Sequence, residues 1–283
     1  MLISERRYRR LLGWLFANLN RKLVIINISY MGLGNRLKLM ASYHANYGLG
    51  GATMYWNVEG WVSAPFGELF EWRGPRFREV AIRLKSWMVP IICYPQKDRW
   101  WSQGYWRFDV EPDVGAQYNI ERWGKTFPAI DFLYERTPEP YLSRYAEFFA
   151  QVRPTPAVQR RIDALKLPAG TMGVQLRISD DPKDVAKVPS LQAYLDVMHA
   201  QEPDTRLYIS AMNASVAEAV RQVFGGRVLE LPGKDYRSMV DATADMYLLG
   251  ACARLVVSDG STFGEVAWWL GGACQPVVEL KAG

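Results

Sequence analysis

The chain has 283 residues, which is enough for two domains of ordinary size, each with its own core. Its composition, 49% apolar and 22% charged, is that of a globular protein and excludes a low-complexity or repeat architecture. A net charge of +5 and a pI of about 9.0 favour an acidic partner: a nucleic acid, an anionic lipid or a phosphorylated substrate.

Residues 1–22 form a basic amphipathic segment. In RRYRRLLGWLFANLNRK, four arginines precede apolar residues at helical spacing. Two interpretations stay open: a helix in an anionic membrane interface through residues 5–22, or a surface helix packed on the first domain. A cleaved signal peptide is disfavoured because basic residues follow the short apolar part. Deleting residues 1–20 separates the two interpretations: the first predicts lost binding to anionic vesicles with folding intact, the second an unfolded domain.

A glycine-containing turn between a strand and a helix is the first candidate binding site. Residues 22–28 are a β-branched run typical of a buried parallel strand. In the next stretch, MGLGNRL, Gly32 and Gly34 allow a tight turn and close approach to a ligand, and Asn35 and Arg36 open a helix. A helix N-terminus suits a phosphate. A dinucleotide fingerprint is disfavoured because its third glycine is missing, and an ordinary strand–turn–helix corner stays an alternative.

The region from residue 49 to 153 carries weaker signals. GGATMYWNVEG predicts a turn and a second strand, and a short helix follows, with Phe66, Leu69 and Phe70 as predicted core. Between residues 75 and 140 the pattern is poor, and the predicted strand is Val89 to Tyr94. Tryptophans of this stretch could line a sugar pocket, although each one alone is more typical of packing: Trp87, Trp100, Trp101, Trp106 and Trp123.

At residue 154 the pattern changes to a regular alternation of strands and helices. Thr155 is predicted to cap a helix with Pro156 in its first position. The predicted strands are 172–176, 206–210, 227–230, 255–258 and 276–280, and the predicted helices are 190–200, 216–224, 238–251 and 262–270. This alternation predicts a doubly wound parallel sheet, which binds ligands at the carboxyl ends of its strands.

Two loops at such strand ends are suited to a diphosphate. In GVQLRISDDPKD, Arg177 directly follows a strand, and its guanidinium can donate two hydrogen bonds to phosphate oxygens. In VVSDGSTFGEVAWWLGG, Ser261 and Thr262 cap a helix and form a second phosphate cradle. The alternatives are a surface ion pair between Arg177 and Asp180 or its neighbour, and simple helix capping by Ser261.

These motifs, in their order, resemble the fucosyltransferase superfamily. The resemblance is carried by GLGNRL, a tryptophan strand followed by PFGELF, GVQLRISD, LYISAMNASVAEAVRQVFGGRV and DATADMYLLGACARLVVSDGSTFGEVAWWLGG. It covers most of residues 23–275 and is strongest to the bacterial nodulation-type enzymes and their alpha-1,6-fucosyltransferase and protein O-fucosyltransferase relatives.

The resemblance implies a GT-B-like α/β fold of two facing Rossmann-like domains with parallel sheets. Residues 23–153 would be the acceptor domain and residues 154–283 the donor domain. It further implies metal-independent, inverting transfer from a nucleotide sugar, GDP-fucose in the family, to a saccharide acceptor. By resemblance Arg177 and Asp180 are the catalytic residues. The donor-binding residues are Gly32, Gly34, Asn35, Arg36, Asn213, Asp245, Ser261 and Thr262.

The sequence departs from the family pattern at three places. Gln175 replaces the histidine of the His-x-Arg motif, and Ile178 replaces the second arginine of the alpha-1,6 enzymes. The family's Thr-Asp-Asp reads Ala211-Met212-Asn213, so one donor-contacting carboxylate is missing and another is an amide. An inactive nucleotide-sugar-binding relative and a glycosyltransferase with a different donor therefore stay as alternatives.

No cofactor and no metal are expected. The sequence has no Asp-x-Asp motif, which other glycosyltransferases use to hold Mg²⁺ or Mn²⁺. Three widely spaced cysteines, Cys93, Cys252 and Cys274, argue against a disulfide framework and fit a reducing compartment. Because the basic residues are spread along the chain, no nucleic-acid partner is expected. The expected location is the cytoplasm, peripheral at the inner membrane surface.

Overall fold

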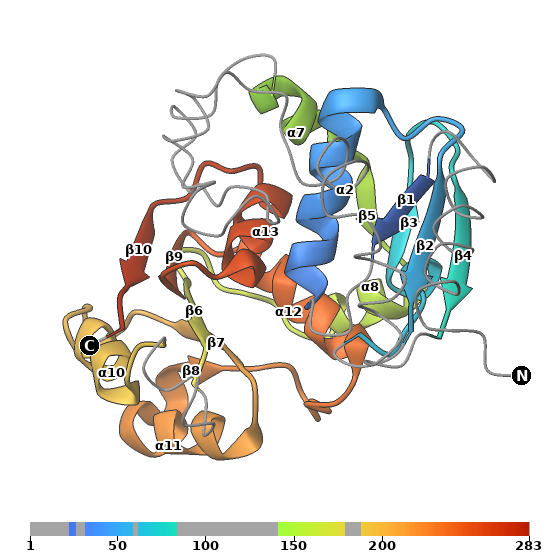
Figure 1. Cartoon of the computed structure of the whole chain (residues 1–283). Coiled ribbons are helices and arrows are strands. Elements are labelled where there is room, and N and C mark those ends of the chain that lie inside the picture. Colours follow the sequence, from blue (N-terminus) through green and yellow to red (C-terminus); the bar gives the residue numbers. More distant parts are fainter. Residues whose placement is uncertain (1–22, 27–31, 59–61, 84–140, 179–187, 283) are drawn as a thin grey trace, which may run out of the picture. The chain divides into compact units, whose positions relative to one another are not determined.

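The chain folds as two α/β units, each with a parallel sheet, which matches the expected fold class (Figure 1). The units are Met1–Arg153 and Pro154–Gly283. The computed structural model describes residues 23–26, 32–58, 62–83, 141–178 and 188–282. The N-terminal basic segment, the strand predicted at 89–94 and Asp180 lie outside these ranges, and so do the tryptophans of the possible sugar pocket. In the described part of the chain no helix is long and apolar enough to cross a membrane.

The N-terminal unit contains a three-stranded parallel sheet in the order β1-β2-β4. These strands are β1 (Leu23–Ile26), β2 (Thr53–Asn57) and β4 (Arg78–Ile82), and α2 (Leu33–Tyr47) connects the first two. The remaining elements are α3 (Phe66–Leu69), β3 (Phe70–Trp72), α7 (Tyr141–Gln151) and β5 (Val152–Pro154), which pairs with β3. Strand β4 escaped prediction because its sequence, REVAI, lacks a clear apolar alternation.

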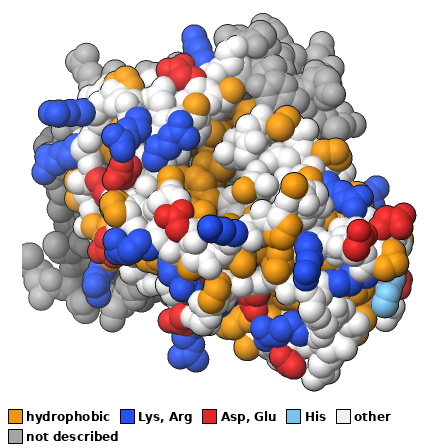
Figure 2. Space-filling model, turned by 180° about the vertical axis from the view of Figure 1, so that it is seen from behind, with side chains coloured by type: hydrophobic (Ala, Val, Ile, Leu, Met, Phe, Trp, Pro, Cys, Tyr) orange, Lys and Arg blue, Asp and Glu red, His pale blue; other side chains and the backbone are white. Residues whose placement is uncertain are grey.

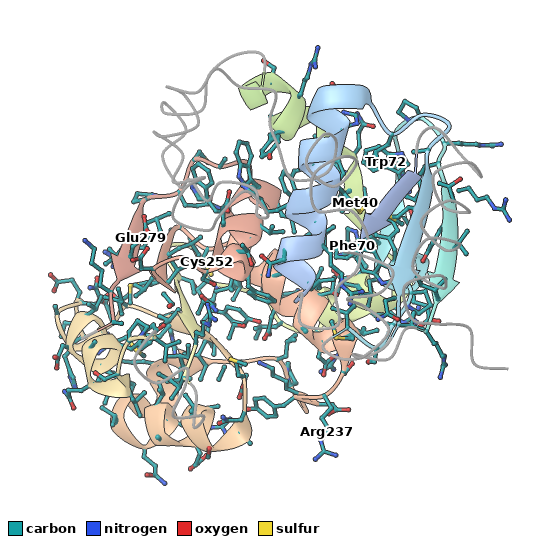
Figure 3. The ribbon with its side chains drawn as sticks, in the orientation of Figure 1. Met40, Phe70, Trp72, Arg237, Cys252 and Glu279 are labelled. Atoms are coloured by element: carbon teal, nitrogen blue, oxygen red, sulfur yellow. The ribbon has the colours of Figure 1, made fainter. Side chains whose placement is uncertain are left out.

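Aromatic packing forms the core of this unit. The predicted core residues Phe66, Leu69 and Phe70 are all buried, so that prediction is confirmed. Phe66 contacts Trp56 edge to face at a centroid distance of 5.5 Å. In Figure 3, Met40 of α2 and Phe70 of β3 lie between that helix and the strands, where both side chains are buried.

The C-terminal unit is a five-stranded parallel sheet in the order β10-β9-β6-β7-β8 (Figure 1). Its strands are β6 (Met172–Leu176), β7 (Leu207–Ala211), β8 (Val228–Leu229), β9 (Arg254–Ser258) and β10 (Val277–Leu280). Its helices are α8 (Pro156–Asp163), α10 (Leu191–His199), α11 (Ala214–Phe224), α12 (Met239–Gly250) and α13 (Thr262–Leu270). From β6 the chain runs outward through β7 to β8, and then returns to place β9 and β10 on the other side. This is the order of a doubly wound sheet.

Helices cover both faces of this sheet. Apolar side chains of β6 at 172, 174 and 176 pack with α10 and α11 in one core cluster, and α12 and α13 contact the strands on the opposite face. Since every residue of β6 is buried, its sequence is a nearly continuous apolar run and does not alternate between apolar and polar residues. The region therefore followed the sequence prediction closely.

Capping residues set several helix starts. Thr155 accepts a hydrogen bond from the amide of Val158, with Pro156 in the first position, as predicted. Helix α11 begins two residues earlier than the predicted 216, because Asn213 caps it. Helix α2 begins at Leu33 with Gly32 at the cap position, so its start also precedes the predicted one.

Candidate functional site

The sheet order of the C-terminal unit places a topological switch point between β6 and β9. Chain connections leave these two neighbouring strands in opposite directions, one toward β7 and the other toward β10. In open parallel sheets, ligands bind in the crevice outside the carboxyl ends of such strands. The predicted phosphate-binding residues Arg177 and Ser261 follow β6 and β9. Both loops chosen from the sequence therefore lie at this one edge.

The two strands separate as they approach this edge. Strand β6 pairs with β9 only from Met172 to Val174, whereas it pairs with β7 along its full length to Leu176. Strand β9 likewise continues with β10 to Ser258. Because the sheet ladder between β6 and β9 ends early, the last two residues of each strand border a gap in the hydrogen bonding.

A buried tyrosine of α10 reaches this gap. The hydroxyl of Tyr194 accepts a hydrogen bond from the amide of Arg177 at 3.4 Å and lies against the side chain of Ser258. Burial raises the pKa of Tyr194 to about 12, and the contacts with the Arg177 amide and the Ser258 side chain and the positive charge of Arg177 oppose that rise. The charge of Arg177 therefore acts on the Tyr194 hydroxyl at the gap, and this hydroxyl stays protonated at neutral pH.

The N-terminus of α13 borders the gap on the β9 side. Gly260 has a positive φ of 69°, which permits the turn from β9 into the helix. The side chain of Ser261 is buried and accepts a hydrogen bond from the amide of Gly264 at 3.3 Å. The capping expected of Ser261 is therefore present. Thr262 opens the helix and is half-buried.

Close packing holds this first turn on the sheet. A Cβ on Gly264 would lie 2.7 Å from Cγ1 of Val257, which real side chains do not tolerate, and 3.4 Å from Oε1 of Gln175. Only glycine lets the helix approach so near. Oε1 of Gln175 is buried and has no hydrogen-bond partner among the described residues. A buried carbonyl oxygen in this state favours a ligand that offers an O–H or N–H group.

Asp245, predicted to bind the donor, lies inside the unit in a polar cluster. Its carboxylate accepts hydrogen bonds from Tyr208 at 2.6 Å, Ser210 at 2.8 Å and Nζ of Lys234 at 2.6 Å. Lys234 also donates to the carbonyl of Ala211 at 3.1 Å, at the end of β7. Burial raises the pKa of Asp245, and Lys234 and the hydrogen bonds lower it. Because both of its oxygens accept hydrogen bonds from side chains of this unit, the carboxylate holds Lys234 at the end of β7.

The cluster continues toward β8 as a chain of alternating charges. Oε1 of Glu230 lies 3.8 Å from Nζ of Lys234 and accepts from Tyr236 at 2.6 Å. Its other oxygen accepts from Arg221 at 2.9 Å. Lys234 was not found from the sequence, where its only signal was a lone lysine in the loop LPGKDY.

The end of β7 presents few polar groups to a ligand. Asn213, predicted to bind the donor, uses Oδ1 to cap α11 by accepting from Val216 at 3.0 Å and from Ser215 at 2.9 Å. The neighbouring side chain is Met212, half of which is exposed. An exposed methionine therefore stands at this edge where the resembled family has a carboxylate.

The predicted glycine-turn residues belong to the N-terminal unit. Gly32 is the cap residue before α2, Gly34 lies in its first turn, and Asn35 is half-buried. Arg36 is fully buried: it donates to the carbonyl of Asn57 at 2.6 Å, and its guanidinium lies 4.9 Å from the ring centre of Trp56. Burial lowers the pKa of Arg36 to about 9. The arginine therefore ties the start of α2 to the end of β2.

The structure thus gathers Gln175, Arg177, Ser261 and Thr262 at one strand edge and adds Tyr194, which sequence reasoning missed. The signal for Tyr194 was a polar aromatic on the apolar stripe of the predicted helix 190–200. Asp245 and Asn213 lie beside this edge but have internal partners. Among the described residues no group of acidic, histidine or cysteine side chains could hold a metal ion.

Solved structures with a similar fold are fucosyltransferases. NodZ alpha-1,6-fucosyltransferase soaked with GDP-fucose is 19% identical, with 92% of this chain and 94% of that chain covered and a TM-score of 0.52. Fucosyltransferase NodZ from Bradyrhizobium is 20% identical, with coverages of 92% and 96% and a TM-score of 0.53. A variant of FUT1 from Arabidopsis thaliana in complex with GDP is 18% identical, with coverages of 99% and 79% and a TM-score of 0.51.

The sequence matches no protein-family model, and a search of curated proteins found no match. The likeness is therefore one of fold, and it agrees with the α/β architecture of parallel sheets expected from the sequence.

Proposed function

We propose that this chain, which has the fold of the fucosyltransferases, is a glycosyltransferase that uses a nucleotide-sugar donor. The observation that carries the proposal is the edge between β6 and β9, where Arg177 and the start of α13 flank a gap in the sheet. An arginine fork and a helix N-terminus are two of the protein groups that bind diphosphates best.

GDP-fucose is the donor that we propose first. NodZ has been solved with GDP-fucose, and FUT1 with GDP. The sequence motifs resemble the same superfamily over most of the chain. The acceptor in this proposal is a saccharide, and the N-terminal unit would present it. Asp245 and Asn213 stay predicted donor-binding residues, although both side chains have internal hydrogen bonds in this structure.

The proposed chemistry is an inverting displacement. A hydroxyl of the acceptor attacks the anomeric carbon, the bond from that carbon to the phosphate oxygen breaks, and the nucleoside diphosphate leaves. The departing oxygens gain negative charge, which Arg177 and the amides of α13 would stabilise in place of a metal ion. Asp180, Asp181 and Asp184, all outside the described residues, are the candidates to accept the proton of the attacking hydroxyl. Gln175 would accept from an O–H or N–H group of the donor.

GDP is expected to raise the thermal unfolding midpoint of the protein in the presence of a chelator. A ligand that binds only the folded state stabilises it, by about 2.7 kcal/mol at a concentration of 100 times its Kd. The measurement is a thermal-shift series with GDP, UDP, ADP and CDP, each with EDTA or with Mg²⁺. Stabilisation by one diphosphate in EDTA supports the proposal. Stabilisation that requires Mg²⁺ would contradict the metal-independent mechanism.

A catalytically inactive nucleotide-sugar-binding protein is the second candidate. It is favoured because Gln175 and Met212 replace a histidine and a carboxylate of the resembled family. Release of GDP from GDP-fucose separates the two, because an inactive protein binds without turnover. A nucleic-acid binder is disfavoured by the charge pattern. In the view of Figure 2, Lys and Arg side chains of the described residues alternate with acidic and apolar ones rather than forming a continuous basic field.

A further inference from the structure

The hydrogen-bonded ladder between β6 and β9 ends early, so the last residues of these two strands do not pair with each other. Gln175 and Leu176 have partners in β7, and Val257 and Ser258 have partners in β10, but the two pairs are not bonded to each other. Sheet hydrogen bonds normally fix the spacing of adjacent strands. At this edge some other contact must set the distance between Arg177 and the loop that leads to Ser261.

Tyr194 supplies that contact from the face covered by α10. Its ring is fully buried in the apolar cluster that includes Leu176, Val256 and Met198, so its position is set by packing. Ser190 caps α10 by accepting from Ala193 at 3.2 Å, which fixes the start of the helix that carries the tyrosine. The ring therefore delivers one hydroxyl to a defined place at the edge of the sheet.

The hydroxyl joins the two separated strands. On the β6 side it accepts the amide proton of Arg177 at 3.4 Å, and on the β9 side it lies against the side chain of Ser258. Ser258 is fully buried, and its carbonyl accepts the amide proton of Ser261 at 3.0 Å. A short chain of contacts thus runs from Arg177 through Tyr194 and Ser258 to the N-cap of α13.

We propose that Tyr194 is a positioning residue that sets the width of the crevice between β6 and β9, and so the spacing between Arg177 and the N-terminus of α13. This inference rests on the proposed function, because it assigns the crevice to the diphosphate of a nucleotide-sugar donor. Transition-state stabilisation by fixed donors is sensitive to displacements of about 1 Å. A hydroxyl that fixes the distance between Arg177 and the N-terminus of α13 therefore affects turnover without contacting the nucleotide sugar.

The substitution that isolates this role is Tyr194→Phe, which removes one oxygen and keeps the buried ring. The matched control is Tyr145→Phe, which removes the same oxygen from a buried tyrosine of the N-terminal unit. Release of GDP from GDP-fucose is measured for both variants and the parent protein. Tyr194→Phe is expected to lower kcat about tenfold and to change KM by less than about twofold, a loss on the scale of one hydrogen bond. Tyr145→Phe is expected to leave both constants unchanged.

A double-variant cycle tests whether Tyr194 acts through Arg177. In an Arg177→Lys background the fork is already lost, so adding Tyr194→Phe is expected to lower kcat by less than about twofold. A tenfold loss in both backgrounds would overturn the positioning role, and so would a parental kcat in Tyr194→Phe. If the parent protein neither binds GDP nor releases it from GDP-fucose, the proposed function fails and this inference fails with it. GDP binding and turnover in the parent with an unaffected Tyr194→Phe overturn only the inference.

Discussion

Replacement of Arg177 by alanine is expected to lower the rate of sugar transfer by about 10²- to 10³-fold while the protein stays folded. Arg177 follows a fully buried strand, and its own amide is held by Tyr194, so its backbone position is fixed. If its guanidinium contacts the diphosphate most strongly as the nucleotide leaves, the loss falls on kcat rather than on KM. Steady-state kinetics of GDP release from GDP-fucose measure the breaking of the donor bond, which transfer and hydrolysis share.

Arg177→Lys and Arg254→Ala are the informative companions of this variant. Lysine keeps the charge but not the planar fork, so it is expected to restore only a small part of the rate. Arg254 begins β9, so it lies at the amino-terminal end of the strands, away from Arg177, and it is half-buried like Arg177. Its replacement by alanine should leave kcat near the parental value. Transfer at the parental rate by Arg177→Ala would make that residue a structural ion-pair partner.

Truncation of Asp245 to alanine is expected to lower the free energy of unfolding by about 3–5 kcal/mol. Lys234 would keep its buried charge but lose the carboxylate at 2.6 Å, and Tyr208 and Ser210 would lose their acceptor. Glu230, whose oxygen lies 3.8 Å from Lys234, is too distant to replace that contact. Urea unfolding, with the denaturant dependence fitted for each variant, gives the loss.

The double variant Asp245→Leu with Lys234→Met tests whether the loss comes from the buried charge of Lys234, which after truncation keeps the 3.8 Å contact with Glu230 and the carbonyl of Ala211. Replacing both partners by apolar side chains of similar size removes the charge that a single truncation strands. The double variant is therefore expected to be more stable than Asp245→Ala. Equal instability of the two would show that Asp245 contributes through Tyr208 and Ser210 instead. GDP-induced stabilisation measured on the same double variant reports whether the Asp245 carboxylate also contributes to binding of the nucleotide.

The C-terminal fold could be predicted from the sequence because its strands are buried on both faces. MGVQL and LYISA read as short apolar runs separated by helical patterns, and only a doubly wound sheet accommodates that alternation. The edge that carries Arg177 and Ser261 follows from the same rule, since loops after parallel strands meet at one end. In the N-terminal unit, β4 has three partly buried and two exposed residues, so no apolar period marks it.

Side-chain partners were the part that could not be predicted. Asp245 and Asn213 were placed by motif, yet a motif does not reveal that Lys234 and the amide of Val216 use their oxygens. Tyr194 is separated by seventeen residues from the amide that it holds, and that contact depends on the packing of α10 against the sheet. Such contacts arise from tertiary structure and leave no local pattern.

The adjacency of β6 and β9 has a consequence for how the chain acquires its crevice. These neighbours in the sheet are separated in sequence by residues 177–253, which include β7, β8, α10, α11 and α12. Loop-closure entropy grows only slowly with loop length, but pairings between residues far apart in sequence slow folding. During synthesis, β6, β7 and α10 can associate well before β9 has left the ribosome. The crevice is therefore among the last parts of its unit to form, and a chain that ends before residue 254 could never assemble it.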